Sequence, residues 1–207
     1  RLVTAGPDAL VFRTSAPTHG ENFTTRSEVT VGPGERIPFV LTWYPSHKPV
    51  PDAIDPEAAL QDTLVYWAEW LESRRPGRPL DAAVEQSLLV LKALTYAPTG
   101  GIVAAPTTSL PEVIGGVRNW DYRYCWLRDA SLTLMAMLQA GYWAEAEAWE
   151  EWLLRAVAGS PEDVQIMYGI AGERRLDERE IPWLPGFLDS RPVRVGNAAS
   201  QQLQLDV

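Results

Sequence analysis

Cysteine and histidine are both scarce in this chain of 207 residues. A single cysteine, Cys125, excludes an internal disulfide framework. The two histidines, His19 and His47, are far apart in sequence, so no zinc-ligand spacing exists and no metal site is predicted. One unpaired cysteine fits a cytoplasmic location, although it does not exclude export.

Positive charge and long apolar runs are also lacking. Lysine and arginine number 18 against 27 aspartates and glutamates, which gives a net charge of −9. No basic stripe offsets this average, so the charge pattern of a phosphate binder is missing. No apolar run approaches the ~18–20 residues of a membrane span. The sequence therefore predicts a protein that binds neither nucleic acid nor membranes.

Tryptophan, in contrast, is abundant, with nine residues in the chain. Large rings bury much area, and the simplest interpretation is that they fill a core. The alternative is a surface that stacks on flat or ring-shaped ligands. Composition alone favours core filling, and only the position of the rings in the sequence changes that balance.

Period-two patterns come first along the chain. They predict strands at 9–14, 22–30 and 36–43, separated by turns that contain glycine and proline. Three strands make a poor independent sheet, so we expect more strands before Arg1. A proline-rich connector, 44–56, follows.

The period then changes to 3.6. Asp55 and Pro56 form a good helix start, and the residues expected to share one helical face are Leu60, Leu64, Trp67 and Leu71. Further helices are predicted at about 81–96, 130–140 and 142–158. Two long loops, 97–128 and 168–196, separate or follow these helices, and loops of that length in a compact domain are usually functional. The pattern suggests stacked helical hairpins with elaborate loops at one end.

Both ends of the sequence look cut. The chain begins at Arg1 without methionine, and it stops at LQLDV, 203–207, within an apolar pattern that has no cap. We therefore expect a piece of a longer protein.

The stretch WDYRYCWLRDA, 120–130, combines four aromatic rings with an adjacent cation and anion, Arg128 and Asp129. Taken alone, Asp129 is a candidate N-cap of the third helix. However, a carboxylate accepts hydroxyl hydrogen bonds and a guanidinium offers a rigid fork of donors. Flanked by rings, the pair matches the polar edge and apolar CH face of a hexose, so sugar recognition is the sharper hypothesis.

Four stretches of the chain resemble the bacterial branch of glycoside hydrolase family 15, which contains glucoamylases, glucodextranases and a group of trehalases. They are LKALTYAPTGGIVAAPTTSLPE (91–112), GGVRNWDYRYCWLRDA (115–130), QIMYGIAGERRL (165–176) and RPVRVGNAASQQLQLD (191–206). The resemblance runs over nearly the whole chain and is weakest in the predicted strands. The block that ends in WLRD is its most specific part.

The resemblance implies a mixed fold. Residues 1–52 would be the C-terminal part of a β-sandwich domain and 53–79 a helical linker. Residues 80–207 would form the N-terminal part of a catalytic (α/α) toroid of six hairpins, with the active site in a funnel of loops at one end.

The resemblance also implies substrate-binding residues. By analogy with the family, Arg128 and Asp129 hydrogen-bond the outer hydroxyls of a terminal glucose, Trp126 shapes the pocket, and Tyr122 lies near the developing cationic sugar ring. The expected ligand is a glucose-terminated oligosaccharide or trehalose, and the linkage stays open. No metal or organic cofactor is implied.

Family members are inverting, exo-acting hydrolases of α-linked glucosides that use two glutamates, with carboxyls ~6.5–9.5 Å apart. The resemblance implies that both glutamates lie beyond Val207, so no catalytic residue maps onto this chain. A non-catalytic carbohydrate-binding toroid fragment is the alternative. A terpene-cyclase-like enzyme would need an Asp-rich metal motif, which the sequence lacks.

Several other residues deserve an interpretation. The cluster Asp177, Glu178 and Glu180 alternates with arginines and is expected to form solvated ion pairs. Cys125 is expected to be a packed thiol. Glu112 lies in a loop that resembles an active-site loop, but one carboxylate does not make a catalytic pair. The open cases, between ligand contact and loop scaffold, are Trp183, Arg194 and Asn197.

Overall fold

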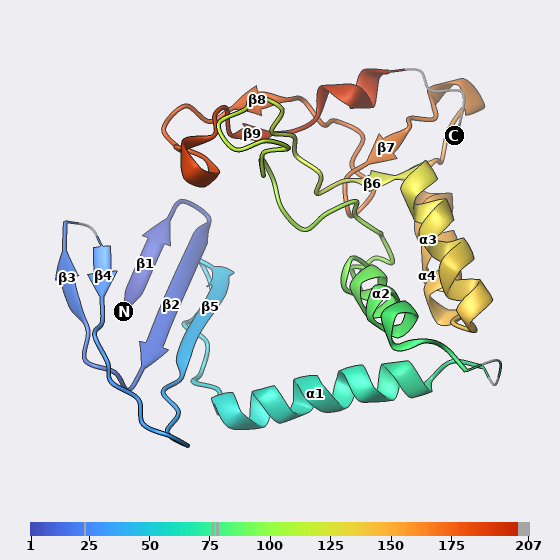
Figure 1. Cartoon of the computed structure of the whole chain (residues 1–207). Helices are drawn as coiled ribbons and strands as arrows, with labels where there is room; N and C mark the ends of the chain where they lie inside the picture. The colour runs from blue at the N-terminus through green and yellow to red at the C-terminus, as the bar shows by residue number, and fades with distance from the viewer. Residues whose placement is uncertain (23, 76, 78, 203–207) are drawn as a thin grey trace. The chain divides into compact units, whose positions relative to one another are not determined.

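A computed structural model describes residues 1–22, 24–75, 77 and 79–202 of the chain (Figure 1). Phe23, in the second predicted strand, and the LQLDV stretch at 203–207 lie outside the described residues. The chain divides into two compact units, Arg1–Ala68 and Glu69–Val207. No helix in the described ranges is long and apolar enough to cross a membrane.

The first unit contains a three-stranded antiparallel sheet in the order β1-β2-β5. Its strands are β1 (Leu2–Ala5), β2 (Asp8–Thr14) and β5 (Phe39–Pro45). Alternation places Ala9, Val11 and Tyr44 in a small buried cluster. The predictions of strands at 9–14 and 36–43 are confirmed to within three residues, whereas the short edge strand β1 was missed.

The prediction of one strand over 22–30 is wrong. The structure has an exposed hairpin instead, formed by β3 (His19–Glu21) and β4 (Thr24–Arg26). The chain reverses at Asn22, whose φ of 48° is left-handed, and asparagine tolerates that conformation better than most residues. Residues 27–30 belong to no strand.

Helix α1 (Pro56–Glu72) begins as predicted. The Asp55 carboxylate accepts hydrogen bonds from the backbone N–H groups of Glu57 and Ala58, at 2.9 and 3.3 Å. On the apolar face of this helix, Leu60 and Leu64 are exposed. The buried residue of this helix is Trp70, in the last turn, and its burial comes from contacts within the second unit.

The second unit is built on α2 (Ala82–Ala93), α3 (Leu127–Ala140) and α4 (Ala144–Ala156). Helices α3 and α4 form a hairpin whose turn is Gly141, with a φ of 99° (Figure 1). The main core cluster consists of Ile102, Val103, Cys125, Leu127, Ala130, Leu134, Trp149, Trp152, Ala156 and Tyr168. Among the described residues, small antiparallel sheets and four α-helices confirm the prediction of a mixed fold.

Two-residue ladders hold the long loops. Strand β6 (Cys125–Trp126) pairs with β7 (Met167–Tyr168), and β8 (Arg179–Glu180) pairs with β9 (Arg194–Val195). Short 3-10 turns complete the loops at Pro161–Asp163, Phe187–Asp189 and Ala198–Gln201. The two ladders, which are separate in Figure 1, therefore join segments of the long loops that are not adjacent in sequence.

A buried polar cluster joins the last turn of α1 to α2 and α4. The Glu145 carboxylate is 5% exposed and accepts from Trp70 Nε1 at 2.6 Å, while Lys92 Nζ lies 3.0 Å from the same oxygen. Tyr142 stacks on Trp70 with ring centroids 4.2 Å apart. Burial alone would raise the pKa of Glu145, but the bonds from Trp70 and Lys92 outweigh it, and the pKa is lowered overall.

We expect Glu145→Gln to lower the free energy of unfolding by about 1–3 kcal/mol at pH 7, because Lys92 loses its counterion. Since folding lowers the pKa of Glu145, its contribution is present above the ordinary value of 4.5 and is lost as the pH falls through the folded value. The difference between the two proteins should shrink correspondingly in acid. Urea unfolding at several pH values measures this.

Glu151→Gln is the matched control, because it removes a carboxylate from the same helix. Glu151 is exposed, and its oxygen lies 3.9 Å from Arg155. Its loss should change the stability by less than about 0.5 kcal/mol. Equal effects of the two substitutions would contradict a specific role for the buried cluster.

Candidate functional site

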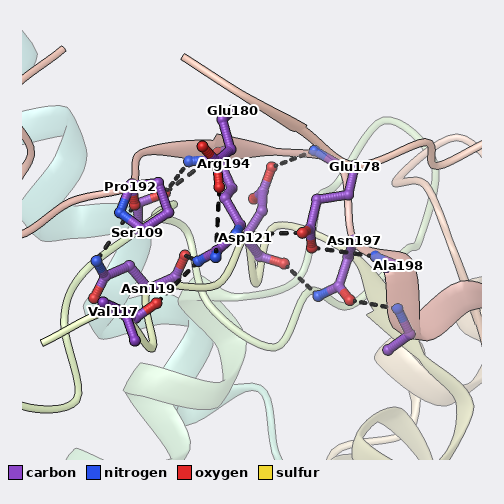
Figure 2. A network of polar contacts seen from close by, with 12 residues as sticks. Ser109, Val117, Asn119, Asp121, Glu178, Glu180, Pro192, Arg194, Asn197 and Ala198 are labelled. Atoms are coloured by element: carbon purple, nitrogen blue, oxygen red, sulfur yellow. Dashed lines mark hydrogen bonds and ion pairs between the residues drawn. The ribbon is translucent and has the colours of Figure 1, made fainter. Parts of the chain in front are cut away.

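Asp121 is the centre of the network that fastens the two long loops together (Figure 2). Its side chain is fully buried. The carboxylate accepts from Arg123 Nε at 2.9 Å and Nη2 at 2.8 Å, and from the backbone N–H of Gly196 at 3.2 Å. Asn197 Nδ2 donates to the Asp121 carbonyl at 2.9 Å. The hydrogen bond to Asp121 raises the pKa of the Arg123 guanidinium.

Gly196 permits the close approach of these loops. Its φ of 88° is left-handed, and a Cβ at this position would collide with the carbonyl of Asp177. Only glycine lets the backbone N–H reach the buried carboxylate here.

Arg194 is the second tie between the loops. Its Nη1 donates to the carbonyls of Val117 and Asn119, at 3.1 and 3.2 Å, and its Cζ lies 4.6 Å from the centroid of the Trp120 ring. Its backbone N–H donates to Ser109 Oγ at 2.7 Å. Arg194, like Asn197, therefore helps to hold the loops together, which supports the scaffold role for both residues.

Two residues of the acidic cluster, Glu178 and Glu180, form ion pairs, but with Arg194 and not with the arginines that neighbour them in sequence. Glu178 lies 3.2 Å and Glu180 3.8 Å from the Arg194 guanidinium. Glu178 is also partly buried and accepts from the N–H of Ala198 at 3.3 Å, so it is not simply solvated. The carboxylates of Glu178 and Glu180 therefore help to hold the loop segments around Arg194 and Ala198 in place.

The remaining open case, Trp183, and Glu112 both lie at the surface. Trp183 is 76% exposed in its loop. Glu112 is in an exposed ion pair, with its Oε2 2.7 Å from Arg118 Nε. Neither residue lies in the Asp121 network.

Trp126, Arg128 and Asp129 lie together where β6 runs into α3. Arg128 Nη2 is 3.2 Å from Asp129 Oδ2, and the Arg128 guanidinium carbon is 5.4 Å from the centroid of the Trp126 ring. The two charged side chains are 38% and 42% exposed, so each is accessible while half-covered. The structure thus brings three of the four predicted binding residues into one cluster.

Asp129 is not the N-cap of the third helix. Helix α3 begins at Leu127 with Trp126 at the cap position, three residues earlier than predicted, and Asp129 lies inside the first turn. A carboxylate there still interacts favourably with the helix dipole. Its side chain nevertheless points to Arg128, with which it forms the ion pair.

Two polar atoms at this cluster lack aligned hydrogen bonds within the described chain. Trp126 Nε1 is buried and has no acceptor, and Asp129 Oδ2 accepts no aligned hydrogen bond despite its ion pair. An unsatisfied buried donor is costly, so a site of this kind gains when a ligand supplies the acceptor.

Tyr122, the fourth predicted binding residue, has no described side-chain contact with this cluster. Its side chain is partly exposed, and its carbonyl accepts from the N–H of Ala105 at 3.0 Å. Among the described contacts, no hydrogen bond joins its side chain to Arg128 or Asp129. The structure therefore does not bring Tyr122 into the cluster as a direct partner.

Cys125 is a packed thiol, as the sequence predicts. It is almost completely buried and reduced, and burial raises its pKa to about 12. A thiol in that state is a poor nucleophile. Within the described ranges, no group of three or more His, Cys, Asp and Glu side chains is placed to hold a metal ion.

Sequence reasoning missed the residues that organise the loops. Asp121, Asn119 and Ser190 are all fully buried, although their types usually lie at the surface. One signal was present for Asp121. Residues two apart on an extended segment point to the same side, so Asp121 and Arg123 were placed to pair.

Comparison with known proteins gives a consistent result. The family model described as glycosyl hydrolases family 15 matches residues 80–207. A trehalase of Mycolicibacterium smegmatis is 40% identical over 188 residues, which cover 88% of this chain and 28% of that protein. Trehalase 1 of Sulfolobus acidocaldarius is 42% identical over 154 residues, which cover 74% of this chain and 26% of that protein.

A trehalase of Thermoplasma acidophilum is also 42% identical, over 147 residues that cover 71% of this chain and 25% of that protein. The chain thus spans about a quarter of the length of the curated relatives that it matches. No solved structure matches it significantly.

Proposed function

The chain belongs to glycosyl hydrolases family 15, and we propose that it is part of a trehalase-like enzyme that releases glucose from an α-linked glucoside. The observation that carries this proposal is the cluster of Trp126, Arg128 and Asp129, with an ion pair 3.2 Å long beside a ring whose N–H has no partner in the described chain. The names of the relatives favour trehalose over an oligosaccharide.

The cluster has the chemistry that a terminal glucose requires. The Asp129 carboxylate accepts from sugar hydroxyls, and the Arg128 guanidinium donates to their oxygens. Each hydrogen bond to a charged group contributes about 1.5–3 kcal/mol. The Trp126 ring offers an apolar surface to the CH face of the sugar, and its Nε1 donates to a hydroxyl oxygen.

The larger architecture belongs to the same proposal. Residues 1–52 form part of a β-sandwich, 53–79 a linker and 80–207 the first hairpins of an (α/α) toroid. The α3–α4 hairpin and the two loop ladders support this division. In a toroid, the loops at one end line the funnel that admits the substrate.

The acid and base of inverting hydrolysis are two glutamates that the family resemblance implies beyond Val207. One protonates the glycosidic oxygen, and the other activates a water on the opposite face. The acidic side chains of the loops serve another purpose, because Glu178 and Glu180 pair with Arg194 and Glu112 pairs with Arg118. The contribution of this chain is to bind the terminal glucose unit of the substrate.

We expect the 207-residue chain to bind trehalose weakly and to release no glucose from trehalose, maltose or isomaltose. In an NMR titration, the indole N–H resonance of Trp126 should move, because the sugar supplies its missing acceptor. The resonance of Trp183, on an exposed loop, is the internal control and should stay in place.

Trp126→Phe assigns the resonance by its disappearance. Specific turnover by the purified chain would contradict the assignment of both glutamates to positions beyond Val207. An unmoved Trp126 resonance at saturating trehalose would contradict the glucose site itself. Binding without turnover in a protein that carries all of the family's segments would favour the non-catalytic alternative.

A further inference from the structure

A cavity of about 610 Å³ opens in the second unit where the end of α2, the segment before β6 and the loop after β7 meet. Its volume is typical of a small-molecule site. The polar and aromatic residues of its wall are Thr95, Tyr96, Arg123, Tyr124, Glu173 and Arg175. None of the four residues assigned to the glucose site lines it.

Arg123 presents a fixed edge of donors to this cavity. Its Nε and Nη2 are held by the buried Asp121 carboxylate, at 2.9 and 2.8 Å. Its Nη1 donates to no residue of the described chain, and the side chain is 43% exposed. A guanidinium has five N–H donors, so an arginine clamped on one side keeps free donors on the other. This is the arrangement of a preorganised binding group.

The rest of the wall suits a sugar ring. Tyr96 and Tyr124 offer aromatic edges and faces, and Leu94 and Val103 add apolar surface. Hexoses have CH faces that pack on such surfaces and equatorial hydroxyls that need donors and acceptors. The wall also contains two groups that can accept hydrogen bonds: the Thr95 hydroxyl and the Glu173 carboxylate, whose Oε2 already accepts from the N–H of Ala171 at 3.0 Å.

The charges of this wall are balanced. Arg123 is paired with Asp121, and the wall carries Arg175 together with Glu173. An excess of positive charge, which an anionic ligand would require, is therefore missing from these four residues. We propose that the cavity binds a neutral sugar unit, and that Arg123 is its principal hydrogen-bond donor. The choice of a sugar rests on the proposed function, whereas the neutrality of the ligand rests on the balanced charges alone.

The test is an NMR titration of the 207-residue chain with trehalose, and with maltose as a second probe. We expect the backbone resonances of Thr95, Tyr96, Tyr124 and Glu173 to move. In Arg123→Lys, binding at these resonances should weaken at least fivefold, because lysine keeps the charge beside Asp121 but loses the planar fork of donors. Arg118→Lys makes the same exchange at an exposed loop arginine and should change nothing.

A second variant keeps the proposal testable if Arg123→Lys disturbs the loops. Pro106 is exposed at the rim of the cavity, and Pro106→Trp should block entry without touching Asp121. Unmoved cavity resonances at saturating sugar, or unchanged affinity in both variants, would overturn the proposal. If the cavity resonances shift and the Trp126 indole resonance does not, the glucose site alone is refuted. If the Trp126 resonance shifts and the cavity resonances do not, the cavity proposal alone is refuted.

Discussion

Asp121→Asn is expected to destabilise the second unit by about 3 kcal/mol, although the two side chains have nearly the same shape. Asp121 is fully buried, and its two oxygens accept from Arg123 and from the N–H of Gly196. An amide in its place turns one acceptor into a donor, which then faces other donors. The Arg123 charge would also lose its buried counterion, a loss moderated by the partial exposure of Arg123.

The measurement is urea unfolding, combined with amide hydrogen exchange at 109–121 and 193–197. We expect exchange to accelerate in both segments, because Asp121 holds one to the other through Gly196 and Asn197. Glu112→Gln removes a carboxylate from an exposed arginine pair on the same loop and should cost less than about 1 kcal/mol. Acceleration confined to one segment would mean that Asp121 does not join the loops.

The loops also show what the sequence was able to predict. Helices with a clear cap or turn, such as α1 after Asp55 and α3 before Gly141, were found because the signal lies within a few residues. Family membership was found for a similar reason, since the WLRD block is short and specific. The exposure of Leu60 and Leu64 could not be read from the sequence, because an apolar helical face does not reveal what covers it.

The contacts that organise the site depend on residues about 75 positions apart, which no local pattern encodes. Asp121 and Gly196 are joined by one hydrogen bond across that separation, as are Ser190 and Gly115. The sequence showed that Arg194 and Asn197 lie in a loop of functional character, but only the fold shows that they hold it together. The Arg128–Asp129 pair was predictable because its partners are adjacent.

Removal of that pair has the largest effect that we expect on activity. In a protein that carries this chain together with the two glutamates, Arg128→Ala or Asp129→Asn should lower kcat/KM for trehalose by at least about a hundredfold, which corresponds to roughly 3 kcal/mol. The reason is that either change removes hydrogen bonds to the sugar hydroxyls in the bound state, and Arg128→Ala also removes the ion-pair partner of Asp129. Stability should change little, because both side chains are half-exposed.

The double variant tests whether Arg128 and Asp129 bind the same glucose hydroxyls or make two independent contacts. If both residues bind the same glucose hydroxyls, the double variant should lose clearly less transition-state free energy than the sum of the losses from Arg128→Ala and Asp129→Asn. Arg118→Ala, which breaks an exposed pair of similar length, should leave kcat/KM within about twofold. A loss below about threefold in either single variant would remove the pair from substrate binding, since a hydrogen bond from a charged group to a bound sugar contributes more than this.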